Sequence, residues 1–368
     1  MSEAVNRVLM TADTVGGVWT FALDLAQALA PYGVEVCLAA MGGEPSASQR
    51  AEAAAIGNLQ LFASEYKLEW MEDPWRDVEA SGYWLLDLER RLHPSLVHLN
   101  TFGHGALSWS VPAMLTAHSC VFSWWASVKG GTPPASWNRY RVEVERSLRC
   151  VPVVTTPSSA MQRALKRLYG VTAECCRVIP NGRDPQRFCA EEKQPFILAA
   201  GRLWDEAKNI AALRDVAGQL SWPVYVAGEA RDPNRKSHAL PGLHMLGKLD
   251  QRQLAKWYAR ASIFAAPARY EPFGLSILEA ALSGCALVLG DIESLRENWQ
   301  DAAIFVRPDD REQLTSALQM LIENPEVRVE WAARSTERAQ RFSATRMAAQ
   351  YVEIYRELTG ERSMRCAS

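Results

Sequence analysis

The sequence lacks the features that would place a protein on a nucleic acid, in a membrane or outside the cell. Its 40 basic residues nearly balance its 42 acidic residues, so the chain as a whole does not attract nucleic acid. No uninterrupted apolar run approaches the roughly 18 residues of a membrane span, and Asn6 to Ala12 is typical of a first β-strand rather than of a secretion signal. The eight cysteines form no CxxC pair and no metal-like spacing with the six histidines. We therefore expect a cytoplasmic protein with reduced thiols, no metal and no nucleic-acid partner.

The sequence does contain a regular alternation of short apolar segments with amphipathic segments. Its 368 residues exceed the ~250–300 at which a single hydrophobic core usually stops growing, so two domains are expected. In the first half, the predicted strands are Arg7–Thr11, Val34–Leu38, Leu96–Leu99, Ala113–Ala117 and Val151–Thr155, and the predicted helices are Val18–Leu29, Trp75–Leu92, Trp137–Arg149 and Ser159–Leu168. This order predicts an α/β fold with a doubly wound parallel sheet.

The same alternation begins again in the second half. The predicted strands there are Pro195–Ala200, Pro223–Ala227, Ser262–Ala265, Ala286–Leu289 and Ala303–Val306. Residues 181–185 have turn chemistry and are followed by a polar segment, which is typical of a linker. We expect one Rossmann-like domain over residues 1–185, a second over 186–343, and a C-terminal helix and tail over 344–368. The helix, Ala344–Leu358, has no strand left to pair with and is expected to cross back to the first domain.

The segment Arg269–Ala280 is the most informative part of the sequence. It follows a predicted buried strand and opens a predicted helix, for which Pro272 is a suitable first residue. At that N-terminus the backbone N–H groups of Phe273, Gly274 and Leu275 would lack partners inside the helix, and the helix dipole favours an anion. The segment therefore predicts a phosphate-binding site.

Two glutamates, Glu271 and Glu279, flank this helix start and are separated by seven residues. One carboxylate can accept hydrogen bonds from sugar hydroxyls and the other from a ribose; the alternative is a capping Glu271 and a solvated Glu279. The pattern resembles the E-x7-E signature of family 4 of the retaining glycosyltransferases, which have the two-domain GT-B fold. The resemblance implies that Glu271 contacts the transferred sugar and that Glu279 contacts the donor ribose. This resemblance covers nearly the whole chain, because three further segments of the sequence match the family at the expected places and in the expected order.

The first of these segments is Gly201–Asn209, which follows the first strand of the second domain and carries Arg202 and Lys208. Both cations are expected at the carboxyl edge of the sheet. A departing nucleoside diphosphate gains negative charge, which two fixed cations can stabilise without a metal. The family uses an arginine and a lysine here for that purpose, whereas two basic residues in a loop, taken alone, are usually solvated.

The other two segments belong to the first domain. Gly16 and Gly17 lie between the first strand and the first helix, where glycines commonly form a tight turn; in the family this loop approaches the donor phosphates and sugar. His118 ends the predicted strand Ala113–Ala117, and a matching histidine lies near the reacting centre of related enzymes. The alternative for His118 is a core histidine with satisfied hydrogen bonds. His93, His98 and His104 are predicted either to have structural roles or to support the residues that contact the substrate.

The resemblance implies a hexosyltransferase that moves a sugar from a nucleotide-diphosphate donor to an unidentified acceptor hydroxyl, with retention of configuration and without a metal or other cofactor. UDP-sugars are the commonest donors in that family and GDP-mannose the second. The alternatives are an NDP-sugar hydrolase, a retaining phosphorylase or a non-catalytic sugar-binding relative. A dinucleotide-dependent oxidoreductase is disfavoured because no G-x-G-x-x-G follows a strand. Residues 290–295 depart from the glycine-rich loop of many family members.

The acceptor is expected on the first domain, near the tryptophans that follow His118. The carboxyl ends of the two predicted sheets are expected to face each other across a cleft, where open α/β sheets bind ligands. Trp124 and Trp125 are adjacent, so at most one is expected to face this cleft, where an indole offers a flat apolar surface and an N–H donor. The alternative is that both belong to the core. The basic stretch Arg163–Arg167 could touch an anionic membrane, but a solvated helix face is favoured.

Overall fold

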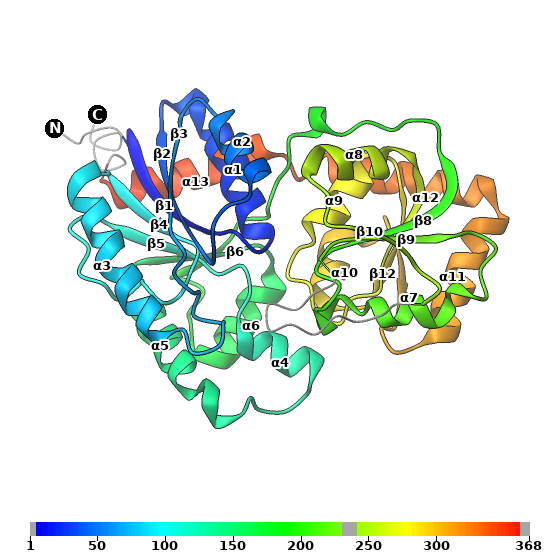
Figure 1. Ribbon diagram of the computed structural model, residues 1–368, viewed down its shortest axis with the longest axis horizontal. Coiled ribbons are helices and arrows are strands. Elements are labelled where there is room, and N and C mark those ends of the chain that lie inside the picture. The colour runs from blue at the N-terminus through cyan, green and yellow to red at the C-terminus, as the bar shows by residue number, and fades with distance from the viewer. Residues whose placement is uncertain (1–4, 230–240, 361–368) are drawn as a thin grey trace. The chain divides into compact units, whose positions relative to one another are not determined.

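The apolar, β-branched runs of the first half form a parallel sheet. The computed structural model describes residues 5–229 and 241–360, and within these ranges the sheet has seven strands in the order β3-β2-β1-β4-β5-β6-β7 (Figure 1). The strands are β1 (Arg7–Asp13), β2 (Glu35–Met41), β3 (Leu59–Ala63), β4 (Leu96–Leu99), β5 (Ala113–Thr116), β6 (Val153–Thr156) and β7 (Cys176–Val178). The helices between them are α1 (Gly17–Leu29), α2 (Ala47–Ala54), α3 (Trp75–Leu92), α4 (Val121–Val128), α5 (Asn138–Cys150) and α6 (Ser159–Tyr169).

Both faces of this sheet are buried, as expected of parallel strands connected by helices. Alternate residues of β1 belong to different core clusters: Val8 and Met10 pack with α1, whereas Leu9 packs with side chains of α3 and α5. The sheet is therefore the middle layer of three.

The second half repeats this architecture. Within the same described ranges, a second parallel sheet has six strands in the order β10-β9-β8-β11-β12-β13. The strands are β8 (Gln194–Ala200), β9 (Val224–Ala227), β10 (His244–Gly247), β11 (Ala261–Ala266), β12 (Ala286–Gly290) and β13 (Ile304–Val306). The helices that follow are α7 (Ile210–Ala217), α8 (Gln251–Arg260), α9 (Leu275–Leu282), α10 (Glu293–Trp299), α11 (Arg311–Glu323), α12 (Pro325–Ala339) and α13 (Ala344–Leu358).

The chain divides into two compact units, which confirms the predicted fold class of two Rossmann-like sheets. The first unit comprises residues up to Trp125, Gly131–Gly182 and the segment from Ala344; the second comprises Ala126–Gly130 and Arg183–Ser343. Three strands, β3, β7 and β10, were not predicted. Each lies at an edge of its sheet, and none of the side chains of β3 and β10 is fully buried, so these strands lack the continuous apolar run of a central strand.

Helix α13 returns to the first unit, as predicted, and lies beside α1 (Figure 1). Its tyrosines reach polar side chains of the central strands: the Tyr355 hydroxyl lies 2.7 Å from Nδ1 of His98, and the Tyr351 hydroxyl lies 3.1 Å from Oγ1 of Thr116. Nε2 of His98 lies 2.7 Å from the same Thr116 oxygen. Burial lowers the pKa of His98 to about 3, so its imidazole is neutral at pH 7. The last helix therefore supplies hydrogen-bond partners to a buried polar group of the sheet.

We expect Tyr355→Phe to destabilise the first unit by about 1–3 kcal/mol, because it leaves a buried imidazole nitrogen without its partner. Tyr83→Phe is the matched control: Tyr83 lies on α3 and is 70% exposed, so its free energy of unfolding should change by less than about 0.5 kcal/mol. Urea unfolding followed by circular dichroism measures both. Equal midpoints for the two variants would show that the Tyr355 hydroxyl contributes nothing.

Candidate functional site

The predicted donor-binding residues of the second unit lie where its sheet reverses its strand order. Strands β8 and β11 are neighbours in the sheet although β9 and β10 separate them in the sequence. Loops that leave the carboxyl ends of two such strands diverge and leave a crevice, which is where open α/β sheets bind ligands. The loop after β8 carries Arg202 and Lys208, and the loop after β11 carries Glu271.

The structure brings Lys208 and Glu271 together. Nζ of Lys208 donates to Oε2 of Glu271, and both side chains are largely buried. The aliphatic part of Lys208 lies close to Gly201: a Cβ added to this glycine would be 3.4 Å from Cε of Lys208. Arg202 instead pairs with Asp205, through an NH2 group 2.7 Å from Oδ2, and remains more exposed than Lys208. One of the two predicted cations therefore already contacts the predicted sugar-binding carboxylate.

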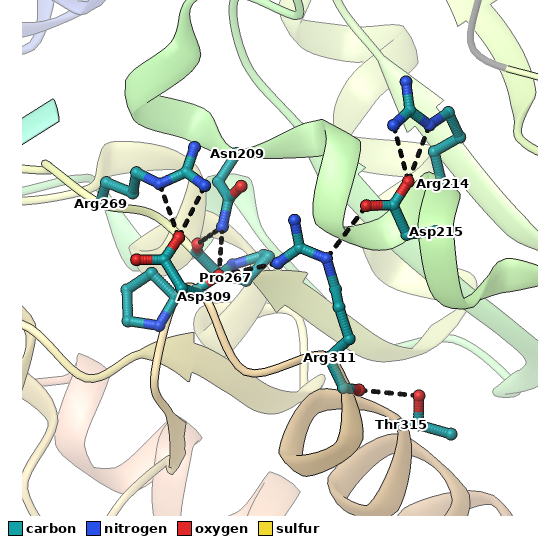
Figure 2. A network of polar contacts seen from close by, with 9 residues as sticks. Asn209, Arg214, Asp215, Pro267, Arg269, Asp309, Arg311 and Thr315 are labelled. Atoms are coloured by element: carbon teal, nitrogen blue, oxygen red, sulfur yellow. Dashed lines mark hydrogen bonds and ion pairs between the residues drawn. The ribbon is translucent and has the colours of Figure 1, made fainter. Parts of the chain in front are cut away.

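A network of polar contacts holds these two loops in place (Figure 2). The amide of Asn209 donates to the carbonyl of Pro267 at 2.8 Å and to that of Pro308 at 2.7 Å. The Arg269 N–H donates to the carbonyl of Ala207, and its guanidinium pairs with Asp309 at 2.7 Å. The loops that carry Lys208 and Glu271 are thus held by Asn209, which directly follows Lys208, and by Arg269, which lies two residues before Glu271.

Helix α9 begins at Leu275, so the predicted start at Pro272 is wrong. Gly274 adopts a φ of +91°, a left-handed conformation that delays the first helical turn. The N–H of Phe273 donates to Oε1 of Glu271 at 3.4 Å, so this group is not unpaired as predicted. Within the described part of the chain, the N–H groups of Gly274, Leu275 and Ser276 have no acceptor. This helix start can therefore bind an anion, one residue further along than the sequence indicated.

Glu279 lies further inside α9 and does not join Lys208 and Glu271. Its carboxylate Oε1 is 3.1 Å from Nε of Arg183, and both side chains are buried. Arg183 was not predicted as a site residue, because its neighbours, Gly182 and Asp184, are typical of a turn. No spacing in the sequence connects Arg183 to the helix.

In the first unit, Gly16 and Gly17 begin α1 at the carboxyl end of β1. Gly16 is the N-cap of α1, with an extended φ of −139°. Its N–H and that of Val15 donate to Oδ1 of Asp13, at 2.7 and 2.9 Å. Asp13 was not predicted as a site residue; its carboxylate closes the loop in which both glycines lie.

His118 lies at the same edge of the first sheet, after β5. Its Nε2 donates to Oδ1 of Asn100 at 2.8 Å, and the Asn100 amide is itself fixed by donating to the Thr11 carbonyl at 2.6 Å. Phe21 of α1 packs edge-on against the imidazole, with 4.5 Å between ring centroids. Burial lowers the pKa of His118 to about 3. The imidazole is therefore neutral, and its Nδ1 is an acceptor rather than an acid.

Trp124 and Trp125 lie on α4 and are both half-buried. Their rings contact each other edge to face, with 6.2 Å between centroids. Neither belongs to the apolar core found in the described part of the first unit, whereas Trp137 packs against that core. The two indoles therefore have surface that the core does not use.

Two further observations concern metals and membranes. In residues 5–229 and 241–360, no three histidine, cysteine, aspartate or glutamate side chains gather as metal ligands would; Asp291, in the loop that departs from the family pattern, pairs with Arg296. None of the helices in these ranges is both long and apolar enough to cross a lipid bilayer.

Two protein-family descriptions match successive parts of the chain. Glycosyltransferase Family 4 matches residues 15–187, and Glycosyl transferases group 1 matches residues 194–324. A glycogen synthase of Mycobacterium tuberculosis is 27% identical over 350 residues, covering 84% of this chain and 83% of that protein. A phosphatidyl-myo-inositol mannosyltransferase of Mycolicibacterium smegmatis is 27% identical over 200 residues, covering 50% of this chain and 52% of that protein.

Solved structures share the fold over nearly the whole chain. The sucrose-phosphate synthase of Thermosynechococcus elongatus has a TM-score of 0.81 at 18% identity, covering 97% of this chain and all of that one. Anabaena HepE in complex with UDP and glucose has a TM-score of 0.74 at 17% identity, covering 96% of this chain and 100% of that one. At such identities the likeness concerns the fold alone.

We expect Asn209→Asp to destabilise the second unit by about 2–4 kcal/mol, because a carboxylate would face two buried carbonyl oxygens that now accept hydrogen bonds. The substitution keeps the shape of the side chain, and the φ of +54° at this position suits aspartate as well as asparagine. Asn138→Asp is the control, since Asn138 is exposed at the start of α5. Urea unfolding should separate the two variants; a wild-type midpoint for Asn209→Asp would show that the network does not hold the loops.

Proposed function

The chain belongs to the family 4 glycosyltransferases of the GT-B fold, and we propose that it is a hexosyltransferase that moves a sugar from a nucleotide-diphosphate donor to an acceptor hydroxyl with retention of configuration and without a metal. The contact between Lys208 and Glu271, beside the free N–H groups at the start of α9, is the observation that carries this proposal. It combines a cation, a hydrogen-bond acceptor and an anion-binding helix start at one sheet edge.

The leaving diphosphate is the part of the reaction that this site supports best. As the bond between sugar and phosphate breaks, negative charge grows on the phosphate oxygens. Lys208 and Arg202 would stabilise that charge, together with the N–H groups of Gly274 and Leu275. Arg202 and Lys208 each pair with a carboxylate, so a diphosphate would replace Glu271 as the partner of Lys208. Glu271 would then be released to accept hydrogen bonds from the sugar.

In this proposal the leaving phosphate oxygen takes the proton of the acceptor hydroxyl, and the protein positions the reactants and stabilises charge. The neutral imidazole of His118 fits such a role, because its pKa of about 3 makes it a poor acid and base at pH 7. It would instead accept a hydrogen bond from a sugar hydroxyl at Nδ1, while Asn100 fixes its orientation through Nε2.

A UDP-sugar is the proposed donor. HepE has been solved with UDP, with UDP and glucose and with UDP-glucose, and the trehalose-6-phosphate protein of E. coli has been solved with UDP-2-fluoro glucose. GDP-mannose is the second candidate, since several relatives are mannosyltransferases.

Incubation of the protein with labelled UDP-glucose, UDP-galactose, GDP-mannose and ADP-glucose, with and without a panel of hydroxyl acceptors, tests the proposal. We expect transfer from one donor in the presence of EDTA, with the donor's anomeric configuration in the product by NMR. Release of free sugar without any transfer would favour a hydrolase. Inversion of configuration, or activity that EDTA abolishes and Mg²⁺ restores, would contradict the proposed mechanism.

Arg202→Ala and Lys208→Ala should each lower turnover by about 10²–10³-fold, because each removes charge stabilisation that increases towards the transition state. Arg214→Ala is the control: Arg214 lies on α7 and pairs with its neighbour Asp215 at 2.6 Å. Steady-state kinetics with the donor identified above provide the measurement. Near wild-type turnover in the Lys208 variant would exclude this lysine from the diphosphate site.

The proposed acceptor wall, an apolar surface against which the acceptor would pack, belongs to the first unit, as His118 does. We assign it to Trp124 or Trp125, whose indoles lie outside the apolar core. Replacing the wall residue by alanine should raise the acceptor KM while donor affinity and slow donor hydrolysis stay at wild-type values. Trp137→Ala, which removes a core-packed indole, should instead lower stability. If donor affinity falls together with transfer in both the Trp124 and Trp125 variants, the acceptor site lies elsewhere.

A further inference from the structure

Arg183 is a fully buried charged residue whose contacts the function proposed above does not use. Its side chain is 2% exposed, and it is among the largest buried side chains of the chain. Nε lies 3.1 Å from Oε1 of Glu279, an NH2 group donates to Oε1 of Gln251 at 2.9 Å, and the guanidinium lies 5.1 Å from the centre of the Phe188 ring. A buried guanidinium is costly without partners of this kind.

The backbone of Arg183 occupies a special place in the chain. Arg183 is the first residue of the second unit after Gly182, and the chain returns to the first unit after Ser343. The N–H of Arg183 donates to the carbonyl of Phe342 at 3.0 Å, and Arg183 forms a parallel bridge with Ser343. The outgoing and returning segments are thus paired at the residue whose side chain reaches Glu279.

Glu279 belongs to the same helix that would bind the donor phosphates. The free N–H groups stand at the start of α9, and Glu279 is the fifth residue of this eight-residue helix, with a side chain 11% exposed. A carboxylate that lies in an ion pair with a buried guanidinium rotates less freely than a solvated one. Less conformational entropy is then lost when a ligand binds to it.

We propose that Arg183 is a positioning residue for the nucleoside half of the donor. It fixes the carboxylate of Glu279 in the orientation that accepts hydrogen bonds from the ribose hydroxyls, and it anchors that carboxylate to the paired segments that connect the two units. The inference rests on the proposed function, in which Glu279 contacts the ribose. A purely structural ion pair would make the opposite prediction: its loss would lower stability without changing which ligand the protein prefers.

Calorimetry can separate the two roles. Wild-type protein is first titrated with UDP, GDP and ADP, and the tightest ligand is then compared with its 2′,3′-dideoxy analogue and with inorganic pyrophosphate. We expect wild type to prefer the ribonucleotide over the dideoxy analogue by about 10–100-fold, as for hydrogen bonds to a charged group. In Arg183→Met the preference should fall below about threefold, while pyrophosphate affinity changes by less than about twofold.

Two further variants keep the test decisive. Arg334→Met is the matched control: it removes an exposed ion pair with Glu330 on α12 of the same unit and should keep the wild-type preference. Arg183→Lys retains the charge without the planar fork of donors, so its preference should fall between those of wild type and Arg183→Met. If Arg183→Met does not fold, Arg183→Lys decides the question.

An unchanged ribose preference in a folded Arg183→Met protein, or in Arg183→Lys where the methionine variant does not fold, would overturn the proposal. A wild-type protein that binds none of the three nucleoside diphosphates would instead refute the proposed function. Binding of these ligands with no ribose preference in wild type would refute the role of Glu279, and with it this inference, while leaving the diphosphate site intact.

Discussion

All strands of a parallel sheet end at the same edge, and the candidate site of the second unit depends on this constraint. It brings the loop after β8 next to the loop after β11, so that Lys208 meets Glu271 across 63 positions of sequence. Backbone approaches backbone closely at this edge: a Cβ on Gly228 would lie 1.7 Å from the carbonyl oxygen of Gly201. Such tight packing leaves little room for the loops to rearrange.

Three basic side chains of the second unit are paired with carboxylates. Lys208 pairs with Glu271, Arg202 with Asp205 and Arg183 with Glu279. An anion that binds Lys208 therefore competes with the carboxylate of Glu271. The net free energy of binding is the difference between the contact that Lys208 gains and the one that it loses. The more exposed Arg202 loses less on such an exchange than a fully buried guanidinium would. Arg202, which is 38% exposed, is therefore better placed to change its partner than Arg183, which is 2% exposed.

The sequence predicts an element well where the burial of its side chains follows a regular pattern. It predicts the element's bounds poorly where the backbone conformation of one residue sets them. Central strands were predicted because both faces are buried, and Ala344–Leu358 was predicted to the residue because its apolar face is regular. The start of α9 was misplaced because Pro272 suits a helix start, whereas the positive φ of Gly274 delays it to Leu275. Phe273 was predicted to offer a free N–H for the same reason.

The sequence predicted candidate site residues that lie on loops after central strands. It did not predict residues whose role depends on a contact formed only in the folded chain. Arg202, Lys208 and Glu271 lie on loops that directly follow central strands, so the topology alone places them at one edge. Asp13, Asn100 and Arg183 have no such pattern, because each acts through a contact that only the folded chain creates. Asn209 is similar: nothing in the sequence shows that its amide bridges two proline carbonyls.

The return of α13 to the first unit also sets an order of events during synthesis. The chain leaves the ribosome from its N-terminus, so the whole second unit is made before the helix that completes the first. Until then the apolar side of α1 has no cover from α13, and His98 lacks the hydroxyl of Tyr355. The second unit, by contrast, has all of its strands and helices once Ser343 has emerged. The half that begins first is therefore the half that finishes last, and it carries an uncovered apolar surface throughout the synthesis of the other.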